Sequence, residues 1–328
     1  MKRVNLKIAL LHNAKPQAIA EPDDQFEEYD SAETINAIAD ALSDYGQVQP
    51  IEAGRNLPRQ LEEGSFDIAF NIAEGHGRRC REAHAAAVCE LLSLPYTHSD
   101  PLTLALTLDK TMAKRAVSPE VRVPRAVLLE SGCEPFHLPF PIVVKPNDEG
   151  SSKGIRDDSL ASDAHHARYL IDRLRRQYGC PILVEQFLQG PEVTVGIVGT
   201  GAKAEVLALM EIAPADASTA FLYSVEAKRA FRERVRYFVP PRLADHTLCD
   251  IRDSALKAYR LLGCRDVARL DFRLDENDRP HFLECNPLPG LNPDTSDLVL
   301  LSRSVMPYRE LVQRILLEAL QRHDMATE

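Results

Sequence analysis

The sequence predicts an α/β protein, and three observations lead to that prediction. Within residues 1–100, strand-like apolar runs alternate with helix-like runs, which is typical of a parallel sheet covered by helices. Near the end of the chain, two alternating runs flank a polar turn, which predicts an antiparallel hairpin. The length of 328 residues, with 45% hydrophobic and 27% charged residues, suits two or three globular domains.

The first expected domain covers residues 1–100. Its helix should begin after Ser31, whose hydroxyl suits an N-cap, because apolar residues then recur at helical spacing. The irregular stretch EGHGRRC follows the second strand, and PYTHSDP predicts a turn at the end of the domain. The expected elements are a strand over residues 4–11, a helix over 32–42, a strand over 66–73 and a helix over 81–94.

Two further domains are expected, a small central α/β layer over residues 101–190 and a C-terminal domain over 191–328. For the central layer we predict a helix over 102–117, a strand over 140–146, a Gly/Ser loop over 147–154, a helix over 161–179 and a strand over 180–188. For the C-terminal domain we predict several strands from residue 193, a helix over 246–264, the hairpin over 266–286 and a closing helix over 308–323.

Charge and composition exclude several classes of partner. The chain has 39 Lys and Arg against 49 Asp and Glu, a net charge of −10, which argues against nucleic acid or an anionic membrane as a partner. No apolar run reaches the ~20 residues of a membrane span, and the N-terminus lacks the pattern of a signal peptide. We therefore expect a cytoplasmic protein. Its seven scattered cysteines predict reduced thiols.

The last hairpin carries the most specific chemistry. Residues two apart on a strand share a face, so FLECN presents Glu284 and Asn286 together, and ARLDF presents Arg269 and Asp271. If the two faces coincide, three oxygen ligands and a guanidinium meet, and such ligands suit Mg²⁺. Cys285 should then face the core. Taken alone, a Glu-x-Asn pair at a strand end is also compatible with an ordinary solvated turn.

Two other segments predict nucleotide binding. In KPNDEGSSKG, Lys145 precedes a loop whose backbone N–H groups can hold phosphate, although the order of residues excludes a P-loop. In LVEQFLQGPE, the backbone of residues 186–188 could contact an adenine edge, with Glu185 or Glu192 at the ribose. The alternatives are a hydrophilic hairpin tip for the first segment and an interdomain linker for the second.

Five ordered motifs together resemble the ATP-grasp fold, and specifically the D-alanine–D-alanine ligases. The resemblance implies three α/β domains with ATP held between the central and C-terminal domains. It also implies ATP and two Mg²⁺ ions as cofactors, with Mn²⁺ as an alternative, and a homodimer. LPYTHSDPLTLALTLDKTMAK resembles the first domain junction of these ligases. The motifs are FPIVVKPNDEGSSKG, ILVEQFLQGPEVTV, VEAK, GCRDVARLDFRL and FLECNPLPG.

The activity that the resemblance implies is ATP-dependent joining of two amino acids through an acyl phosphate. Asp271, Glu284 and Asn286 resemble the Mg²⁺ ligands of the family. Arg269 and the N–H of Gly290 resemble the groups that hold the tetrahedral intermediate, while a loop over residues 223–236 would exclude water. The residues that resemble ATP contacts are Lys110, Lys145, Ser152, Glu185, Gln186, Phe187, Leu188, Glu192 and Lys228. Ser151 resembles the serine that positions the first amino acid.

The sequence departs from the family on the amino-acid side. Residues 12–30 replace the first glycine-rich loop, so that Glu27 or Glu28 is the nearest candidate for its substrate-binding glutamate. Arg81 and Glu82 stand where the family has an acidic pair, and Arg229 stands where it has a tyrosine. The segment that follows Gly290 is also rewritten, and its candidate substrate contacts are Thr295 and Ser296.

These departures leave the substrates open. The two arginines favour a substrate with a second carboxylate or a phosphate over D-alanine. Alternatively, they pair with acidic residues of the chain itself, for which Glu82, Glu226 and Glu233 are the candidates. Other possibilities for the function are an ATP-grasp ligase or kinase that acts on a larger natural-product or carrier-bound acid, and a nucleotide-binding protein without catalysis.

Overall fold

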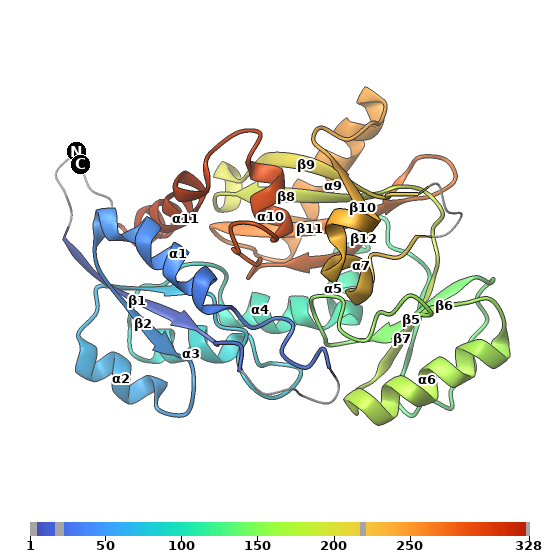
Figure 1. Ribbon diagram of the computed structural model, residues 1–328, viewed down its shortest axis with the longest axis horizontal. Coiled ribbons are helices and arrows are strands. Elements are labelled where there is room, and N and C mark those ends of the chain that lie inside the picture. The colour runs from blue at the N-terminus through green and yellow to red at the C-terminus, as the bar shows by residue number, and fades with distance from the viewer. Residues whose placement is uncertain (1–4, 17–22, 217–220, 326–328) are drawn as a thin grey trace.

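A computed structural model describes residues 5–16, 23–216 and 221–325, and these form three β-sheets. Figure 1 shows the first sheet at the lower left, the second at the lower right and the third above them. Each sheet lies within one of the three residue ranges expected for the domains, although those boundaries themselves remain predictions. Residue 4 of the predicted first strand and residues 17–22 of the predicted substrate loop lie outside the described residues.

The first sheet is parallel, as predicted, with the strand order β2-β1-β3. Ser31 caps its first helix by accepting a hydrogen bond from the N–H of Thr34. We did not predict β2 or α2, because β2 is an edge strand with Ile51 as its one buried residue and therefore shows little apolar alternation. The elements are β1 (Leu6–His12), α1 (Ala32–Leu42), η1 (Ser43–Tyr45), β2 (Gly46–Glu52), α2 (Leu57–Gly64), β3 (Ile68–Asn71) and α3 (Ala83–Leu91).

The second sheet is antiparallel, with the order β4-β7-β5-β6, and α6 packs against it. The single helix predicted over residues 102–117 is wrong, because the chain extends at Asp109 (φ −83°, ψ 99°) and two helices result. The carboxylate of Asp109 caps the second one by accepting from the N–H of Met112 at 3.0 Å. The elements are α4 (Pro101–Leu108), α5 (Lys110–Val117), β4 (Ala126–Leu129), β5 (Ile142–Pro146), β6 (Leu160–Ala161), α6 (Ala164–Tyr178) and β7 (Ile182–Gln186).

The third sheet is antiparallel, with the order β10-β9-β8-β11-β12, and it contains the predicted hairpin as β11 and β12. Its strands are β8 (Glu192–Val198), β9 (Glu205–Pro214), β10 (Val235–Phe238), β11 (Val267–Leu274) and β12 (Pro280–Asn286). The remaining helices are η2 (Gly201–Lys203), α7 (Val225–Arg229), α8 (Phe231–Arg234), α9 (Asp245–Leu261), α10 (Asp297–Ser302) and α11 (Tyr308–Arg322).

The closing helix α11 returns to the first domain and packs against α1, as Figure 1 shows. Ile8 and Leu10 of β1 share one buried apolar cluster with Ile315 and Leu316 of α11. This shared core fixes the first sheet relative to the third, so that residues from both can line one site. None of the helices in the described part of the chain is long and apolar enough to cross a membrane.

Candidate active site

Two adjoining cavities lie where segments from the three sheets meet. The larger, which we call the polar cavity, has a volume of about 370 Å³ and is lined by residues from both ends of the chain, including Glu28, Arg269 and Gly290. The smaller, which we call the narrow cavity, has a volume of about 70 Å³. Tyr223 and Lys228 line both cavities. The arrangement therefore offers two binding regions with a common boundary.

The narrow cavity gathers the residues predicted to hold the nucleotide. Its apolar walls include Val143, Ile155 and Leu283, which suit a flat ring. The Arg273 guanidinium lies 4.5 Å from the centre of the Phe187 ring and pairs with Glu192 at 3.2 Å. The predicted ATP contacts that line this cavity are Lys145, Ser152, Glu185, Gln186, Phe187, Leu188, Glu192 and Lys228.

Glu185 connects two buried lysines. Its carboxylate lies 2.7 Å from Lys145 Nζ and 3.0 Å from Lys114 Nζ. Burial lowers the pKa of Lys114 to about 8, against the opposing effect of Glu185. The sequence reasoning missed Lys114, although it stands four residues after Lys110 on the same face of α5. The pairing holds Lys145 at the wall of the narrow cavity; the predicted ribose contact of Glu185 stays a prediction.

The hairpin brings the four predicted metal-site residues together. Asp271 lies opposite Glu284, and Arg269 lies opposite Asn286, in the β11–β12 register. Arg269 donates to both oxygens of Asp271 at 2.9 and 3.2 Å. The amide nitrogen of Asn286 donates to Asp271 at 3.3 Å, and within the described part of the chain the amide oxygen has no hydrogen-bond partner and could bind a cation. Cys285 faces the core, as predicted.

Burial and the charges around the hairpin shift the pKa values of its two carboxylates in opposite directions. Burial raises the pKa of Asp271, the Arg269 guanidinium opposes this effect, and the neighbouring Glu284 adds to it. Although burial opposes ionisation of Glu284, Lys110 and Lys145 lower its pKa to about 2. Lys110 Nζ lies 3.3 Å from the Glu284 carboxylate. Two carboxylates and an amide oxygen are the hard ligands that Mg²⁺ prefers, so this donor set fits the predicted metal.

A hydrogen-bonded chain supports Arg269 from the side of the polar cavity. Arg269 lies 3.3 Å from Asp297, which accepts a hydrogen bond from the Tyr223 hydroxyl at 2.9 Å. The hydroxyl oxygens of Tyr223 and Tyr237 are 2.7 Å apart. The sequence reasoning did not identify Asp297, because it begins α10 and meets Arg269 only in the folded chain.

The loops around Arg269 complete the polar cavity. Ser151, Gly290, Thr295 and Ser296 all line it. A side chain at Gly290 would place its Cβ 2.9 Å from the Ser296 hydroxyl, closer than real Cβ contacts allow without a shift. The absence of a side chain there leaves the Gly290 backbone open to a ligand. Ser151 adopts a left-handed conformation with φ 48°, which turns the chain at the cavity wall.

The segment of residues 223–236, predicted to exclude water, is bonded to the Gly/Ser loop. The Ser152 hydroxyl donates to the backbone carbonyl of Tyr223 at 2.9 Å, and the N–H of Val225 donates to the carbonyl of Ile155 at 3.0 Å. The segment forms α7, α8 and the start of β10. These bonds attach the segment to the Gly/Ser loop next to Tyr223, which lines both cavities. The exclusion of water by this segment stays a prediction.

The two arginines predicted to meet substrate are paired within the chain. Arg81 pairs with Glu28 at 2.8 Å and with Glu149 at 3.3 Å, and its side chain is only 4% exposed. The Arg81 guanidinium also donates a hydrogen bond to the backbone carbonyl of Asp148 at 2.9 Å. The partner suggested from the sequence, Glu82, is therefore wrong for Arg81. The charge of Arg81 is satisfied without a substrate anion.

Arg229 is paired as well, but at the surface. Its guanidinium lies 2.7 Å from Asp23 and 2.8 Å from Glu27, and its side chain is 40% exposed. The expected partners Glu226 and Glu233 do not take this role; Glu226 instead pairs with Arg156 at 3.1 Å. Asp23 and Glu27 belong to the N-terminal loop that differs from the family pattern, so the positive charge of Arg229 is neutralised by this loop.

We expect these two arginines to differ sharply in their effect on stability. Arg81→Gln should cost about 3–5 kcal/mol of unfolding free energy, because it leaves Glu28 buried beside a single cation. Arg229→Gln should cost at most about 1 kcal/mol, because exposed ion pairs contribute little. Urea unfolding of both variants measures the difference. Equal losses would contradict the assignment of Arg81 to a buried structural pair.

Comparisons with known proteins agree with this geometry. Residues 130–317 match the family model described as D-ala D-ala ligase C-terminus. The chain is 33% identical over 273 residues to a D-alanine–D-alanine ligase of Bordetella petrii. This alignment covers 82% of this chain and 80% of the ligase. It is 31% identical over 293 residues to a D-alanine–D-alanine ligase of Nitrosospira multiformis, and this alignment covers 87% of this chain and 90% of the ligase.

Solved structures show the same fold. The D-alanine–D-alanine ligase from Bacillus anthracis complexed with ATP matches with a TM-score of 0.75 at 19% identity, over 98% of this chain and 99% of that one. The D-Ala:D-Ser ligase VanG from Enterococcus faecalis matches with a TM-score of 0.72 at 18% identity, over 96% of this chain and 99% of that one. These likenesses confirm the predicted ATP-grasp fold.

Proposed function

Since the chain belongs to the D-alanine–D-alanine ligase family, we propose that it is an ATP-dependent ligase that joins two amino acids through an acyl phosphate. The observation that carries the proposal is the place of the hairpin. Asp271 lines the narrow cavity, Asn286 lines the polar cavity, and Glu284 lines both. A group held by these three residues would therefore lie between the nucleotide and the amino acids.

The reaction follows from this arrangement. The carboxylate of one amino acid attacks the γ-phosphate of ATP, so that ADP leaves and an acyl phosphate forms. The amine of the second amino acid then attacks the activated carbonyl, phosphate leaves, and an amide bond remains. Transfer of this kind depends mainly on positioning and on electrostatic stabilisation.

The residues of this chain have different roles in the proposed reaction. Lys145, Lys228 and the loop that contains Ser152 bind the phosphates of ATP at the boundary of the two cavities. Arg269 and the N–H of Gly290 stabilise the oxyanion of the tetrahedral intermediate, and a donor of this kind is typically worth ~2.7–4 kcal/mol. The segment of residues 223–236 keeps water from the acyl phosphate.

Asp271, Glu284 and Asn286 would hold Mg²⁺. When bound, the metal supplies charge neutralisation on the phosphoryl oxygens and orients them for transfer. The residues around the polar cavity differ from the family pattern at Arg81 and Arg229, so the proposed substrates are amino acids as a class and D-alanine is one candidate among them.

The proposal is tested at the nucleotide first. Lys145→Ala and Lys228→Ala should each weaken binding of a non-hydrolysable ATP analogue by about tenfold or more, because each removes a cation from the narrow cavity. Calorimetric titration with the analogue and Mg²⁺ measures this effect. Lys257→Ala, on the outer helix α9, is the matched control.

The second part of the test is the reaction itself. Wild-type protein is incubated with ATP, Mg²⁺ and a panel of D- and L-amino acids, and ADP release and product mass are measured. A ligase gives ADP, phosphate and a dipeptide mass. Unchanged affinity for the analogue in both lysine variants, or the absence of any amide product across the panel, would count against the proposed function.

A further inference from the structure

Arg269 lies between two aspartates, and the proposed reaction uses only one of them. Its Nε and one Nη donate to Asp271, while the other Nη donates to Asp297 at 3.3 Å. Asp271 belongs to the proposed metal site, so a bound cation would share its charge. The Asp297 carboxylate has two hydrogen-bond partners among the described residues, Arg269 and the Tyr223 hydroxyl at 2.9 Å. Asp297 is therefore the aspartate that remains to neutralise Arg269.

The position of Asp297 in the fold does not account for this carboxylate. Asp297 is the first residue of α10, where an acidic side chain often stabilises the helix N-terminus. The helix has only six residues, however, and the Asp297 carboxylate accepts from no backbone N–H in the described part of the chain. The residue is 6% exposed and lines the polar cavity next to Arg269. Its carboxylate therefore belongs to the cavity and not to the helix.

The two aspartates leave Arg269 without a net charge for a substrate carboxylate. Even when a metal ion shares the charge of Asp271, the pair of Arg269 and Asp297 is neutral. A guanidinium has five N–H donors, of which the two aspartates use three. The remaining two suffice for the oxyanion of the intermediate. A carboxylate of the second amino acid would therefore meet a neutral ion pair instead of a free cation.

The other basic side chains at the polar cavity are engaged elsewhere. Lys110 and Arg229 are paired with carboxylates of the chain. Lys228 is proposed to bind the phosphates of ATP. Lys15 is exposed and acts on the neighbouring Asp30, whose pKa it lowers against the larger effect of burial. Together with Arg269, these are the basic side chains of the described residues that line the cavity.

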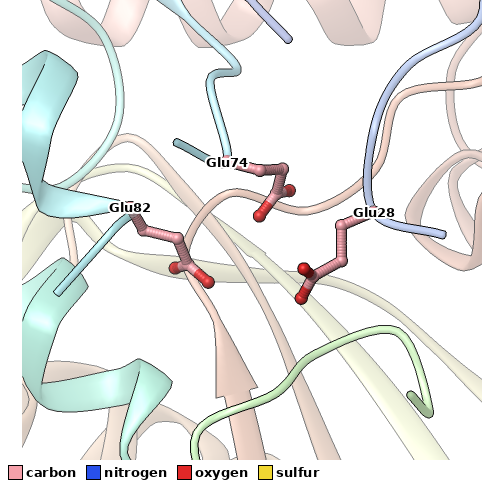
Figure 2. Close-up of side chains that lie close together, drawn as sticks. All are labelled: Glu28, Glu74 and Glu82. Atoms are coloured by element: carbon pink, nitrogen blue, oxygen red, sulfur yellow. The ribbon is translucent and has the colours of Figure 1, made fainter. Parts of the chain in front are cut away.

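Carboxylates outnumber these cations along the wall of the polar cavity. Figure 2 shows three of them, Glu28, Glu74 and Glu82, pointing toward one another across a common gap. Each offers an oxygen within 4.8 Å of the others. A further carboxylate brought by a substrate is repelled by such a wall unless a cation compensates it. The proposed metal site compensates the carboxylate that attacks ATP, but no comparable group is left for a second one.

We propose that Asp297 selects a second substrate that has no free carboxylate: an amino acid amide, or the N-terminal residue of a peptide. A carboxylate offers about four lone-pair sites, and Arg269 and Tyr223 use two of those on Asp297. The N–H of a carboxamide or a peptide can donate to a site that remains. A carboxylate has no hydrogen to donate and carries the same charge as Asp297.

This inference rests on the proposed function and narrows its second substrate. The first amino acid keeps a free carboxylate, because that group attacks ATP. The amine of the amidated second amino acid then attacks the acyl phosphate. A C–N bond forms, the C–O bond to phosphate breaks, phosphate leaves with the bonding electrons, and the proton of the amine passes to water. The product is a peptide that keeps the amide end of the second substrate.

The test is a competition between two forms of one amino acid. Wild-type protein, ATP and Mg²⁺ are incubated with the amino acid that releases most ADP and with an equal concentration of its own amide. Mass detection separates the dipeptide from the dipeptide amide. We expect the dipeptide amide to exceed the dipeptide by at least about tenfold. An excess of the dipeptide, or equal amounts, would overturn the proposal whatever the variants do.

Two variants show whether Asp297 causes the preference. Asp297→Asn keeps the shape of the side chain but removes its charge, and should lower the ratio of dipeptide amide to dipeptide at least about tenfold, with unchanged affinity for the ATP analogue. Asp297→Ser should do the same, and replaces the first variant if that one does not fold. Amidation also makes the amine less basic, but this effect is common to all variants and cancels in the comparison.

The matched control removes a carboxylate from the same loop. Asp294 is 75% exposed, pairs with Arg303 and does not line the polar cavity, so Asp294→Asn should keep the wild-type product ratio. An unchanged ratio in both Asp297 variants would refute selection by Asp297. An equal fall in Asp294→Asn would assign the preference to the net charge of the loop, and would also contradict the proposal.

Hydroxylamine separates failure of this inference from failure of the proposed function. It is a small nucleophile without a carboxylate, and it converts an acyl phosphate into a hydroxamate as phosphate leaves. Wild-type protein with ATP, Mg²⁺, the amino acid and hydroxylamine should give ADP and the hydroxamate. Hydroxamate together with a product ratio that does not depend on Asp297 would refute the inference and leave the ligase function standing. Absence of ADP, hydroxamate and amide products across the panel would refute the ligase function, and this inference with it.

Discussion

Glu284→Gln and Asp271→Asn are each expected to lower kcat by at least about 10³-fold. Both substitutions preserve shape but replace a carboxylate by an amide in the proposed metal site, where charge on the transferred phosphoryl group would be neutralised. Because Glu284 also pairs with Lys110 at 3.3 Å, its replacement additionally removes the ion pair of this buried lysine. Initial rates of ADP release at saturating ATP, Mg²⁺ and amino acid measure the effect.

The control for these variants lies in the same hairpin. Glu276→Gln changes an exposed glutamate in the β11–β12 turn and should keep wild-type turnover. The Tm of all three variants should show that the fold is intact. Turnover within about tenfold of wild type in either Glu284→Gln or Asp271→Asn, at saturating Mg²⁺, would contradict the proposal that the hairpin binds the metal.

Arg269→Lys is expected to lower kcat by about 10²–10³-fold while leaving the affinity for the ATP analogue unchanged. Arg269 lines the polar cavity but not the wall of the narrow one, and it contacts Asp271 and Asp297 at once. Lysine keeps the charge but not the planar fork that reaches both carboxylates and an oxyanion together. Because a cation remains near both carboxylates, the loss of stability should be smaller than with alanine.

Measurements on two variants separate the role of Arg269 in the reaction from its structural role. Arg269→Lys and Arg269→Ala are compared in kcat, in analogue affinity and in urea unfolding. If the kcat of the lysine variant is nearly that of the wild-type protein, charge alone is sufficient and oxyanion binding by the guanidinium is contradicted. If analogue affinity falls in parallel with kcat, Arg269 belongs to the nucleotide site instead.

The sequence by itself determined the fold class and identified the residues that line the proposed nucleotide site. The period of two in ARLDF and FLECN predicted that Arg269 and Asp271 share a face of one strand, and that Glu284 and Asn286 share a face of the other. The β11–β12 register then sets Asp271 opposite Glu284 and Arg269 opposite Asn286, so that the two pairs meet. Residues 185–188 and Glu192 line the narrow cavity for a similar reason, since they belong to one continuous segment whose residues are positioned locally. Local periodicity is sufficient where a site is built from neighbours in the chain.

Some local features were nevertheless invisible in the pattern. The break at Asp109 divides a stretch that the sequence predicted as one continuous helix, because the carboxylate of that residue caps α5. Glu74 follows the buried strand β3, and side chains at the carboxyl ends of parallel strands often gather in a binding site. That signal was present in the sequence, but the nearness of Glu74 to Glu28 and Glu82 could be seen only in the folded chain.

Only the tertiary structure decided which charged residues pair with one another around the polar cavity. Whether Arg81 meets a substrate anion or Glu28 depends on two loops that are 53 residues apart in the chain, and no periodicity relates them. The same fold pairs Glu28 with Arg81 and Lys153 and places Glu74 and Glu82 at the wall of the polar cavity. Electrostatic compensation depends on distance in space, and for residues from separate segments that distance is set by packing rather than by sequence spacing.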